Sequence, residues 1–216
     1  MIDGTQKSLV MEATVGKTTG IPSHDSPAQM CVRHLRWPCR VRSLSAVSLT
    51  LTLLWLRRDL RLSDHAALAA AWSRGGPVVP VYVHDNVSEL SSSAGAASRW
   101  WLHHSLVALD KALRSRGARL TFAAGPTVET LVGLVRATGA AAVYWQRSHE
   151  PAMRAVESAL AQRLAALGVE AKAFPGALLF DPDTVRNRQG GPFQVFTPFW
   201  RHLQTLEVAP PVAMPG

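Results

Sequence analysis

The sequence is poor in cysteine, and it contains no long uninterrupted stretch of apolar residues. Its two cysteines, Cys31 and Cys39, both lie near the N-terminus, so neither a disulfide framework nor a CxxC metal knuckle supports the rest of the chain. We therefore expect a reducing, cytoplasmic location. No apolar run reaches the roughly 18 residues that a membrane-spanning helix requires, because Arg, His, Asp or Gly interrupts the longest candidates. The composition thus predicts a protein without a membrane segment.

Several motifs of nucleotide-binding and hydrolytic enzymes are also missing. The dinucleotide fingerprint GxGxxG, the GxSxG nucleophile elbow and the HExxH metal motif do not occur. The triplet Gly16-Lys17-Thr18 looks like the end of a P-loop, but Met11 stands where that motif requires glycine. Neither paired carboxylates, a metal-ligand set nor a nucleophile beside a base stands out. We therefore expect no self-contained catalytic centre and no metal site in this chain.

What the sequence does contain is enough apolar material for one domain. Its 216 residues are 47% hydrophobic and 18% charged, which is typical of a folded protein with a sizeable core. The formal net charge is +8, and arginine supplies most of the positive charge. This balance permits a nucleic-acid partner, although a genome rich in arginine codons would produce the same excess.

The chain divides into three parts. Residues 1–48 mix Gly, Ser, Thr, Pro and scattered charges without a period of 2 or 3.6, so we expect a disordered extension or a start codon assigned too far upstream. Residues 49–206 have the regular pattern of a single folded domain. Residues 207–216 are expected to begin an interdomain linker that is cut short.

Apolar runs alternate with helical patterns from residue 49 onward. Strands are predicted at 49–56, 78–83, 119–123, 141–145 and 169–174. Helices are predicted between them at 63–75, with Ser63 as its N-cap, and at 98–116, 126–139 and 151–168. The alternation predicts an α/β fold, a doubly wound, Rossmann-like sheet of five parallel strands with helices on both faces.

Ligands of such sheets bind outside the carboxyl ends of the strands, where the strand order reverses. Polar residues follow three of the predicted strands at 57–59, 84–85 and 146–150. These three segments are therefore the first places to look for a binding site.

Three motifs resemble segments of the DNA photolyase and cryptochrome family. They read WLRRDLRLSD at residues 55–64, YWQRSHEP at 144–151 and GGPFQVFTPFW at 190–200. In the family, the first motif joins a strand to a helix, the second follows a later strand, and the third is a V-[FY]-[TG]-P-F-W signature. His65 departs from the pattern, because the family usually has Asn there. The resemblance covers residues 49 to about 206.

The resemblance implies a specific function. Photolyases use light and reduced FAD to repair ultraviolet-induced pyrimidine dimers in DNA, whereas cryptochromes use the same scaffold for light signalling. The FAD and the damaged DNA bind a C-terminal helical domain, which this chain, ending at Gly216, is expected to lack. The α/β domain of relatives holds an antenna chromophore, such as a folate, a deazaflavin or a flavin. We therefore expect a monomeric antenna-binding domain that is inactive alone.

Four residues are the predicted cofactor-binding set. Arg58 would face a ring or a phosphate of the chromophore, unless it is a surface arginine. Tyr82 and Asp85 match positions that line the antenna pocket of deazaflavin-type relatives, unless they are a core tyrosine and a loop aspartate. Glu150 would bind the chromophore or, alternatively, cap the helix that starts at Pro151.

Other residues limit what the resemblance can say. Asp59 is expected to brace its turn, by a hydrogen bond or by pairing with Arg61, and not to bind a ligand. Ser148 replaces an acidic residue that some deazaflavin-binding relatives have, so the chromophore stays open. Residues 197–200 are expected to pack the domain against its linker. Two alternatives remain: a fragment of a cryptochrome-type blue-light receptor, and a stand-alone nucleotide- or flavin-binding module.

Overall fold

A sheet of five parallel strands forms the centre of the protein. The computed structural model describes residues 50–85, 95–176 and 178–215. The strands are β1 (Thr52–Leu56), β2 (Val78–His84), β3 (Thr121–Ala124), β4 (Ala142–Gln146) and β5 (Glu170–Phe174). Their order across the sheet is β3-β2-β1-β4-β5, and every neighbouring pair is parallel. The sequence-based prediction of a doubly wound α/β sheet is confirmed.

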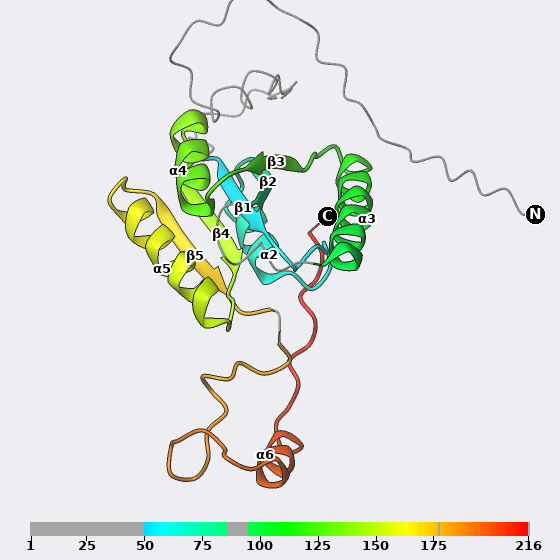
Figure 1. The fold of residues 1–216 in the computed structure, drawn as a ribbon, viewed down its shortest axis with the longest axis vertical. Helices are drawn as coiled ribbons and strands as arrows, with labels where there is room; N and C mark the ends of the chain where they lie inside the picture. The colour runs from blue at the N-terminus through cyan, green and yellow to red at the C-terminus, as the bar shows by residue number, and fades with distance from the viewer. Residues whose placement is uncertain (1–49, 86–94, 177, 216) are drawn as a thin grey trace, which may run out of the picture.

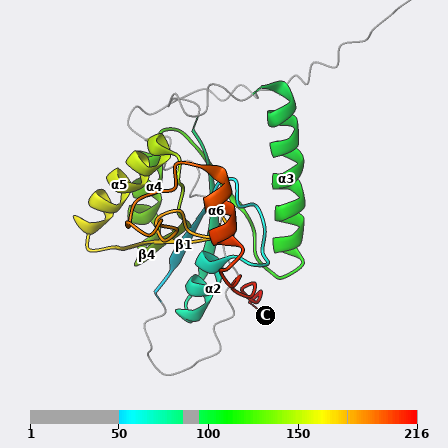
Figure 2. The same ribbon diagram turned by 90° about the horizontal axis from the view of Figure 1, so that it is seen from below.

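Helices cover both faces of this sheet (Figure 1). They are α2 (Ala66–Ser73), α3 (Ala96–Arg114), α4 (Thr127–Thr138) and α5 (Pro151–Ala165). Alternate residues of β1 point to opposite faces, so Leu53 packs with α4 and α5 while Leu54 packs with α2 and α3. Figure 2 shows the same division, with α3 and the α4–α5 pair on opposite sides.

Burial of the strands follows their position in the sheet. All five residues of β1 and all five of β4 are buried, whereas β3 and β5 at the edges are partly exposed. Central strands of a parallel sheet are covered on both faces, so their sequences read as continuous apolar runs. The runs TLLWL and AVYWQ fit this rule, which is why the strand pattern was readable from the sequence.

The start of the first predicted helix was wrong by two residues. The N-cap of α2 is His65, whose ring Nδ1 accepts a hydrogen bond from the backbone N–H of Leu68 at 3.1 Å. Ser63 does not cap it, because Asp64 adopts a left-handed backbone with φ of 50° and keeps residues 63–64 in a turn. The buried histidine ring takes the position in which a shorter polar side chain usually caps a helix.

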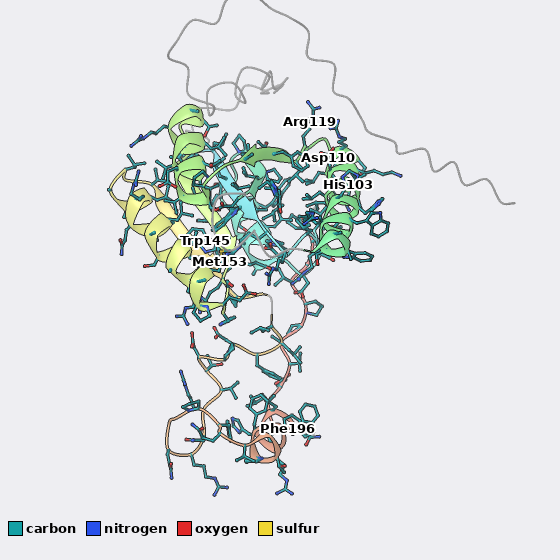
Figure 3. The ribbon with its side chains drawn as sticks, viewed as in Figure 1. His103, Asp110, Arg119, Trp145, Met153 and Phe196 are labelled. Carbon is teal, nitrogen blue, oxygen red and sulfur yellow. The ribbon has the colours of Figure 1, made fainter. Side chains whose placement is uncertain are left out.

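An excursion follows β5 and leaves the sheet. It contains α6 (Phe196–Leu203), which has no buried residue and lies apart from the α/β body (Figure 1). Figure 3 shows Phe196 at the far end of this excursion from Trp145. The prediction that residues 197–200 pack the domain against its linker was therefore wrong: the rings of α6 contact one another, with Phe196 stacked on Trp200 at 6.2 Å.

The chain then returns to the body. Near the C-terminal end, Val212 exchanges two hydrogen bonds with Asp64, one at 3.1 Å and one at 3.0 Å. This contact ties the returning segment to the turn between β1 and α2. Within the described ranges, no helix combines the length and the apolar character that crossing a membrane requires.

Candidate functional site

The sheet order places a reversal point between β1 and β4. After β1 the chain turns to α2 on one face, and after β4 it turns to α5 on the other face. The segments that leave β1 and β4 therefore diverge at the carboxyl edge of the sheet, which is where ligands of such sheets bind. Arg57 and Arg58 directly follow β1, Gln146 ends β4, and Glu150 immediately precedes α5.

Arg58 and Glu150 meet at this reversal point. The guanidinium of Arg58 donates a hydrogen bond to the Glu150 carboxylate, and the two form an ion pair. Their side chains are 85% and 53% exposed, so both remain accessible to a ligand. Glu150 occupies the N-cap position of α5, but its side chain accepts no capping hydrogen bond there. The carboxylate therefore faces Arg58 and does not close the helix end.

Arg57 lies deeper and was not predicted as part of the site. Its guanidinium donates to the backbone carbonyl of Gln146, sits over the Trp55 ring at 4.4 Å, and lies 2.7 Å from Oε1 of Glu157. Glu157 also accepts a hydrogen bond from the backbone N–H of Ser148 at 2.8 Å. This network joins the ends of β1 and β4 to α5. The sequence held one signal for this network. Glu157 is a charged residue that shares the buried face of α5 with Leu160 and Leu164, and a buried charge needs a partner.

Asp59 braces the turn after β1, as the sequence indicated. Its Oδ1 accepts the backbone N–H of Arg57 at 2.8 Å, and its Oδ2 lies 3.0 Å from Nε2 of the buried His65. Arg61, the alternative partner, instead donates to the carbonyl of Gly176 at 2.6 Å. Burial of Asp59 opposes ionisation, but the hydrogen bonds from His65 and Arg57 outweigh it and lower the pKa of this carboxyl below its ordinary value.

Tyr82 and Asp85, the other two predicted residues, have partners on different elements. The Tyr82 ring is half-buried against Phe122 of β3, with the centroids 6.5 Å apart, and its burial raises the pKa of the phenol. Asp85 Oδ2 accepts hydrogen bonds from the Thr127 backbone N–H at 3.1 Å and from the Thr127 hydroxyl at 2.9 Å. Asp85 thus caps α4. Among the described residues, Arg58 and Glu150 are the two members of the predicted set that touch each other.

Comparison with known proteins identifies the family. The profile of the family described as DNA photolyase matches residues 52–216. The chain belongs to the DNA photolyase family. It carries the N-terminal α/β domain that photolyases and cryptochromes share.

Individual relatives agree with this family assignment. The chain is 43% identical over 152 residues to a deoxyribodipyrimidine photo-lyase of Agrobacterium fabrum, a match that covers 70% of the chain and 31% of the relative. It is 35% identical to cryptochrome-1 of Arabidopsis thaliana, over 74% of the chain and 23% of the relative. Among solved structures, a class III photolyase of Agrobacterium tumefaciens matches with a TM-score of 0.70 and 39% identity, over 79% of this chain and 36% of that one.

These matches cover only part of each relative. The chain spans about a third of the length of the photolyases it resembles and about a quarter of the plant cryptochrome. Photolyases as a family act on DNA and bind FAD and antenna chromophores. The match to this chain concerns the α/β part of that architecture.

Proposed function

We propose that this chain is the antenna-chromophore-binding domain of a deoxyribodipyrimidine photolyase. The observation that carries the proposal is the exposed Arg58–Glu150 pair at the reversal point of the sheet. In parallel α/β sheets that point is where ligands bind. The membership of residues 52–216 in the photolyase family supplies the chemical context.

The residues at the reversal point fit a flat heterocycle with polar edges. Arg58 offers a planar set of N–H donors, and Glu150 offers a carboxylate acceptor at the positive end of α5. A deazaflavin, a flavin or a folate carries both acceptors and donors on its ring edge. Tyr82 and Asp85, at the end of the neighbouring strand β2 and just after it, remain part of the proposed set. A bound chromophore would absorb light and pass the excitation to FAD.

The decisive experiment is a titration of the protein with a deazaflavin, flavin mononucleotide and a folate. We expect one of the three to bind more tightly than about 100 μM. Arg58→Ala and Glu150→Ala should each weaken this binding roughly 10- to 150-fold, since each removes one charge-assisted hydrogen bond. Asp85→Ala should weaken it as well, and should also destabilise α4 because the helix loses its cap.

Arg163→Ala provides the matched control, because Arg163 is an exposed arginine near the other end of α5. This variant should bind the chromophore as the wild type does. If no chromophore binds, or if the Arg58 and Glu150 variants bind as the wild type does, the proposed site is wrong. If Glu150→Ala lowers stability without changing affinity, the carboxylate serves only the helix.

The photolyase role of the whole protein is a separate part of the proposal. Dimer repair and tight FAD binding are assigned to a helical domain outside the segment that this chain shares with its relatives. We therefore expect purified chain, reduced FAD and near-ultraviolet light to leave dimer-containing DNA unchanged. Light-dependent loss of dimers above a protein-free control would contradict this.

A cryptochrome-type light receptor is the second candidate, because cryptochrome-1 of Arabidopsis thaliana is 35% identical over 160 residues. The two roles differ in the helical domain. Fusing this chain to the sequence encoded downstream in its genome and assaying light-dependent repair would separate them. Repair by the fusion supports the photolyase role, whereas FAD binding without repair supports the receptor. If the downstream sequence encodes no helical, tryptophan-rich continuation, the stand-alone chromophore-binding module is favoured.

A further inference from the structure

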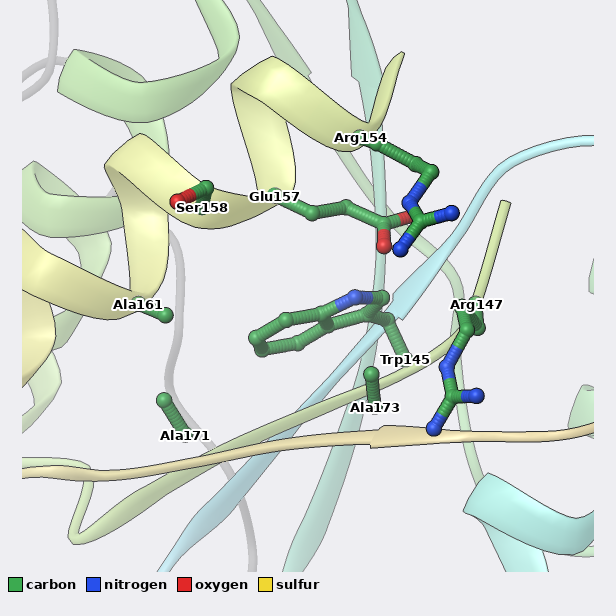
Figure 4. Close-up of a pocket in the computed structure, with 8 residues that line it drawn as sticks. All are labelled: Trp145, Arg147, Arg154, Glu157, Ser158, Ala161, Ala171 and Ala173. Carbon is green, nitrogen blue, oxygen red and sulfur yellow. The ribbon is translucent and has the colours of Figure 1, made fainter. Parts of the chain in front are cut away.

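A groove beside α5 forms a cavity that the predicted site does not include. It has a volume of about 280 Å³ and lies between α5 and the strands β4 and β5 (Figure 4). Its lining is Trp145, Arg147, Arg154, Glu157, Ser158, Ala161, Ala171 and Ala173. Three of these residues are alanines on facing elements, so the space exists because the side chains of α5 and β5 are short at this point.

The floor of the groove holds an unused hydrogen-bond donor. Trp145 is 2% exposed, and its indole Nε1–H has no acceptor in the structure. Figure 4 shows the nitrogen edge of the indole turned toward the end of the groove where Arg154 and Glu157 lie. The surrounding side chains also close this nitrogen to solvent, so a ligand acceptor reaches the N–H after they shift, and the new bond satisfies a donor that is otherwise unpaired.

The charge around the groove favours an anion. The Glu157 carboxylate is held by Arg57 at 2.7 Å, and the Arg147 guanidinium is paired with Asp181 at 3.1 Å, so these charges are balanced. Arg154 is exposed at the mouth, and no described carboxylate lies within ion-pair distance of it. The net excess is one positive charge, carried by a guanidinium whose planar donor set matches carboxylates and phosphates.

We propose that this groove binds a small organic anion with a ring-sized apolar body and one carboxylate or phosphate group. The anionic group pairs with Arg154 and accepts the Nε1–H of Trp145, while the body lies against Ala161, Ala171 and Ala173. The volume suits this size, since a cavity of about 150 Å³ already accommodates benzene. This ligand is distinct from the antenna chromophore, because its site lies along α5 and not at the Arg58–Glu150 pair.

The test uses four small probes with the full chain. Benzoate and phenyl phosphate combine a ring with an anionic group, benzamide is the neutral counterpart of benzoate, and inorganic phosphate lacks the ring. We expect benzoate or phenyl phosphate to bind with roughly millimolar Kd, and benzamide and inorganic phosphate to bind at least about 5-fold more weakly. The readout is the indole N–H resonance of Trp145 in a two-dimensional NMR spectrum, assigned by its absence in Trp145→Phe. Calorimetry gives the affinity independently of that assignment.

Two variants separate the proposal from nonspecific binding. Arg154→Ala should weaken anion binding about 10-fold, and Ala161→Leu, which fills the groove, should abolish it. Arg163→Ala on the same helix, outside the groove, should bind as the wild type does. The proposal is overturned if neither anion binds below about 20 mM, if benzamide binds as well as benzoate, or if Arg154→Ala retains wild-type affinity.

Discussion

The helices of the α/β body and α6 of the excursion after β5 all carry apolar side chains, but only the helices of the body bury some of them. In the body, Leu131 of α4 and Leu160 of α5 are fully buried against the sheet. In the excursion, Phe196 is 70% exposed and Trp200 is 49% exposed, although α6 is strongly amphipathic. The difference shows that an apolar helix face is buried only where a second layer is present to cover it.

The two regions also differ in how their polar groups are held. The body joins Asp59, His65 and Arg57 in a buried network, and Arg57 continues it to Glu157. The polar contacts within the excursion, such as Asp183 with Arg186 three residues away at 4.0 Å, are short-range, and the pair of Asp181 with Arg147 at 3.1 Å ties its start to the body. Long-range polar contacts couple elements of the body to one another, whereas local contacts only shape a loop. The following substitutions test this contrast.

Truncating an apolar side chain should lower the free energy of unfolding most strongly in the body and hardly at all in the excursion. Leu131→Ala is expected to lower the free energy of unfolding by about 2–5 kcal/mol, because it removes a fully buried side chain and leaves a cavity. Trp200→Ala in α6 should change it by less than about 0.5 kcal/mol, because half of that side chain is already in water. Urea denaturation followed by circular dichroism measures both. Equal effects would show that α6 is packed as firmly as the body.

Removing the Asp59 charge should destabilise the body by about 1.5–3 kcal/mol at neutral pH, the usual contribution of hydrogen bonds to a buried charged group. The folded-state pKa of Asp59 is lowered, so its contribution is fully present above the unfolded value of about 3.9 and is lost as pH falls through the lower folded pKa. The stability difference between wild type and Asp59→Asn should therefore be larger at pH 7 than at pH 3.

The matched control is Asp183→Asn in the excursion, whose carboxylate is about half exposed. Its unfolding curve should superimpose on that of the wild type at both pH values. A wild-type advantage over Asp59→Asn that persists unchanged at low pH would contradict the assigned charge state.

Removing the histidine cap should lower the free energy of unfolding by a smaller amount, and a conservative replacement should restore part of that loss. His65→Ala should cost about 0.5–2 kcal/mol for the lost cap, because the Leu68 backbone N–H at the start of α2 loses its acceptor, and more in total because Oδ2 of Asp59 also loses the buried ring beside it. His65→Asn should recover part of this loss, since an asparagine side chain can cap the same N–H. Thermal unfolding of the three proteins checks the order, and an Asn variant no better than the Ala variant would rule out a capping role.

The smallest effect is expected from deleting residues 1–48. Their sequence lacks the periodicity that buried elements require, so the free energy of unfolding of the remaining chain should change by less than about 1 kcal/mol. Differential scanning calorimetry of the deletion variant measures this. A fall of many degrees in the melting temperature would show that these residues contribute to the fold.

How much of the fold and of the site could be predicted depended on how far apart in the sequence the interacting residues lie. The strands were visible because continuous apolar runs such as TLLWL follow from burial on both faces, and the helices were visible from apolar spacing between glycines. The Asp59 brace was predicted because it acts two residues away. His65 was missed as the cap of α2, because its ring fits only where the turn and Asp59 enclose it.

The sequence by itself determined the family, the alternation of strands and helices that gives a parallel sheet, and the edge of that sheet where ligands are expected. These follow from local patterns and from three short motifs. Only the tertiary structure decided that Arg58 meets Glu150 across 92 positions, that Asp85 caps α4, and that short side chains leave a groove beside Trp145. The physical reason is that side-chain pairing and cavities depend on the packing of distant elements, which no local pattern encodes.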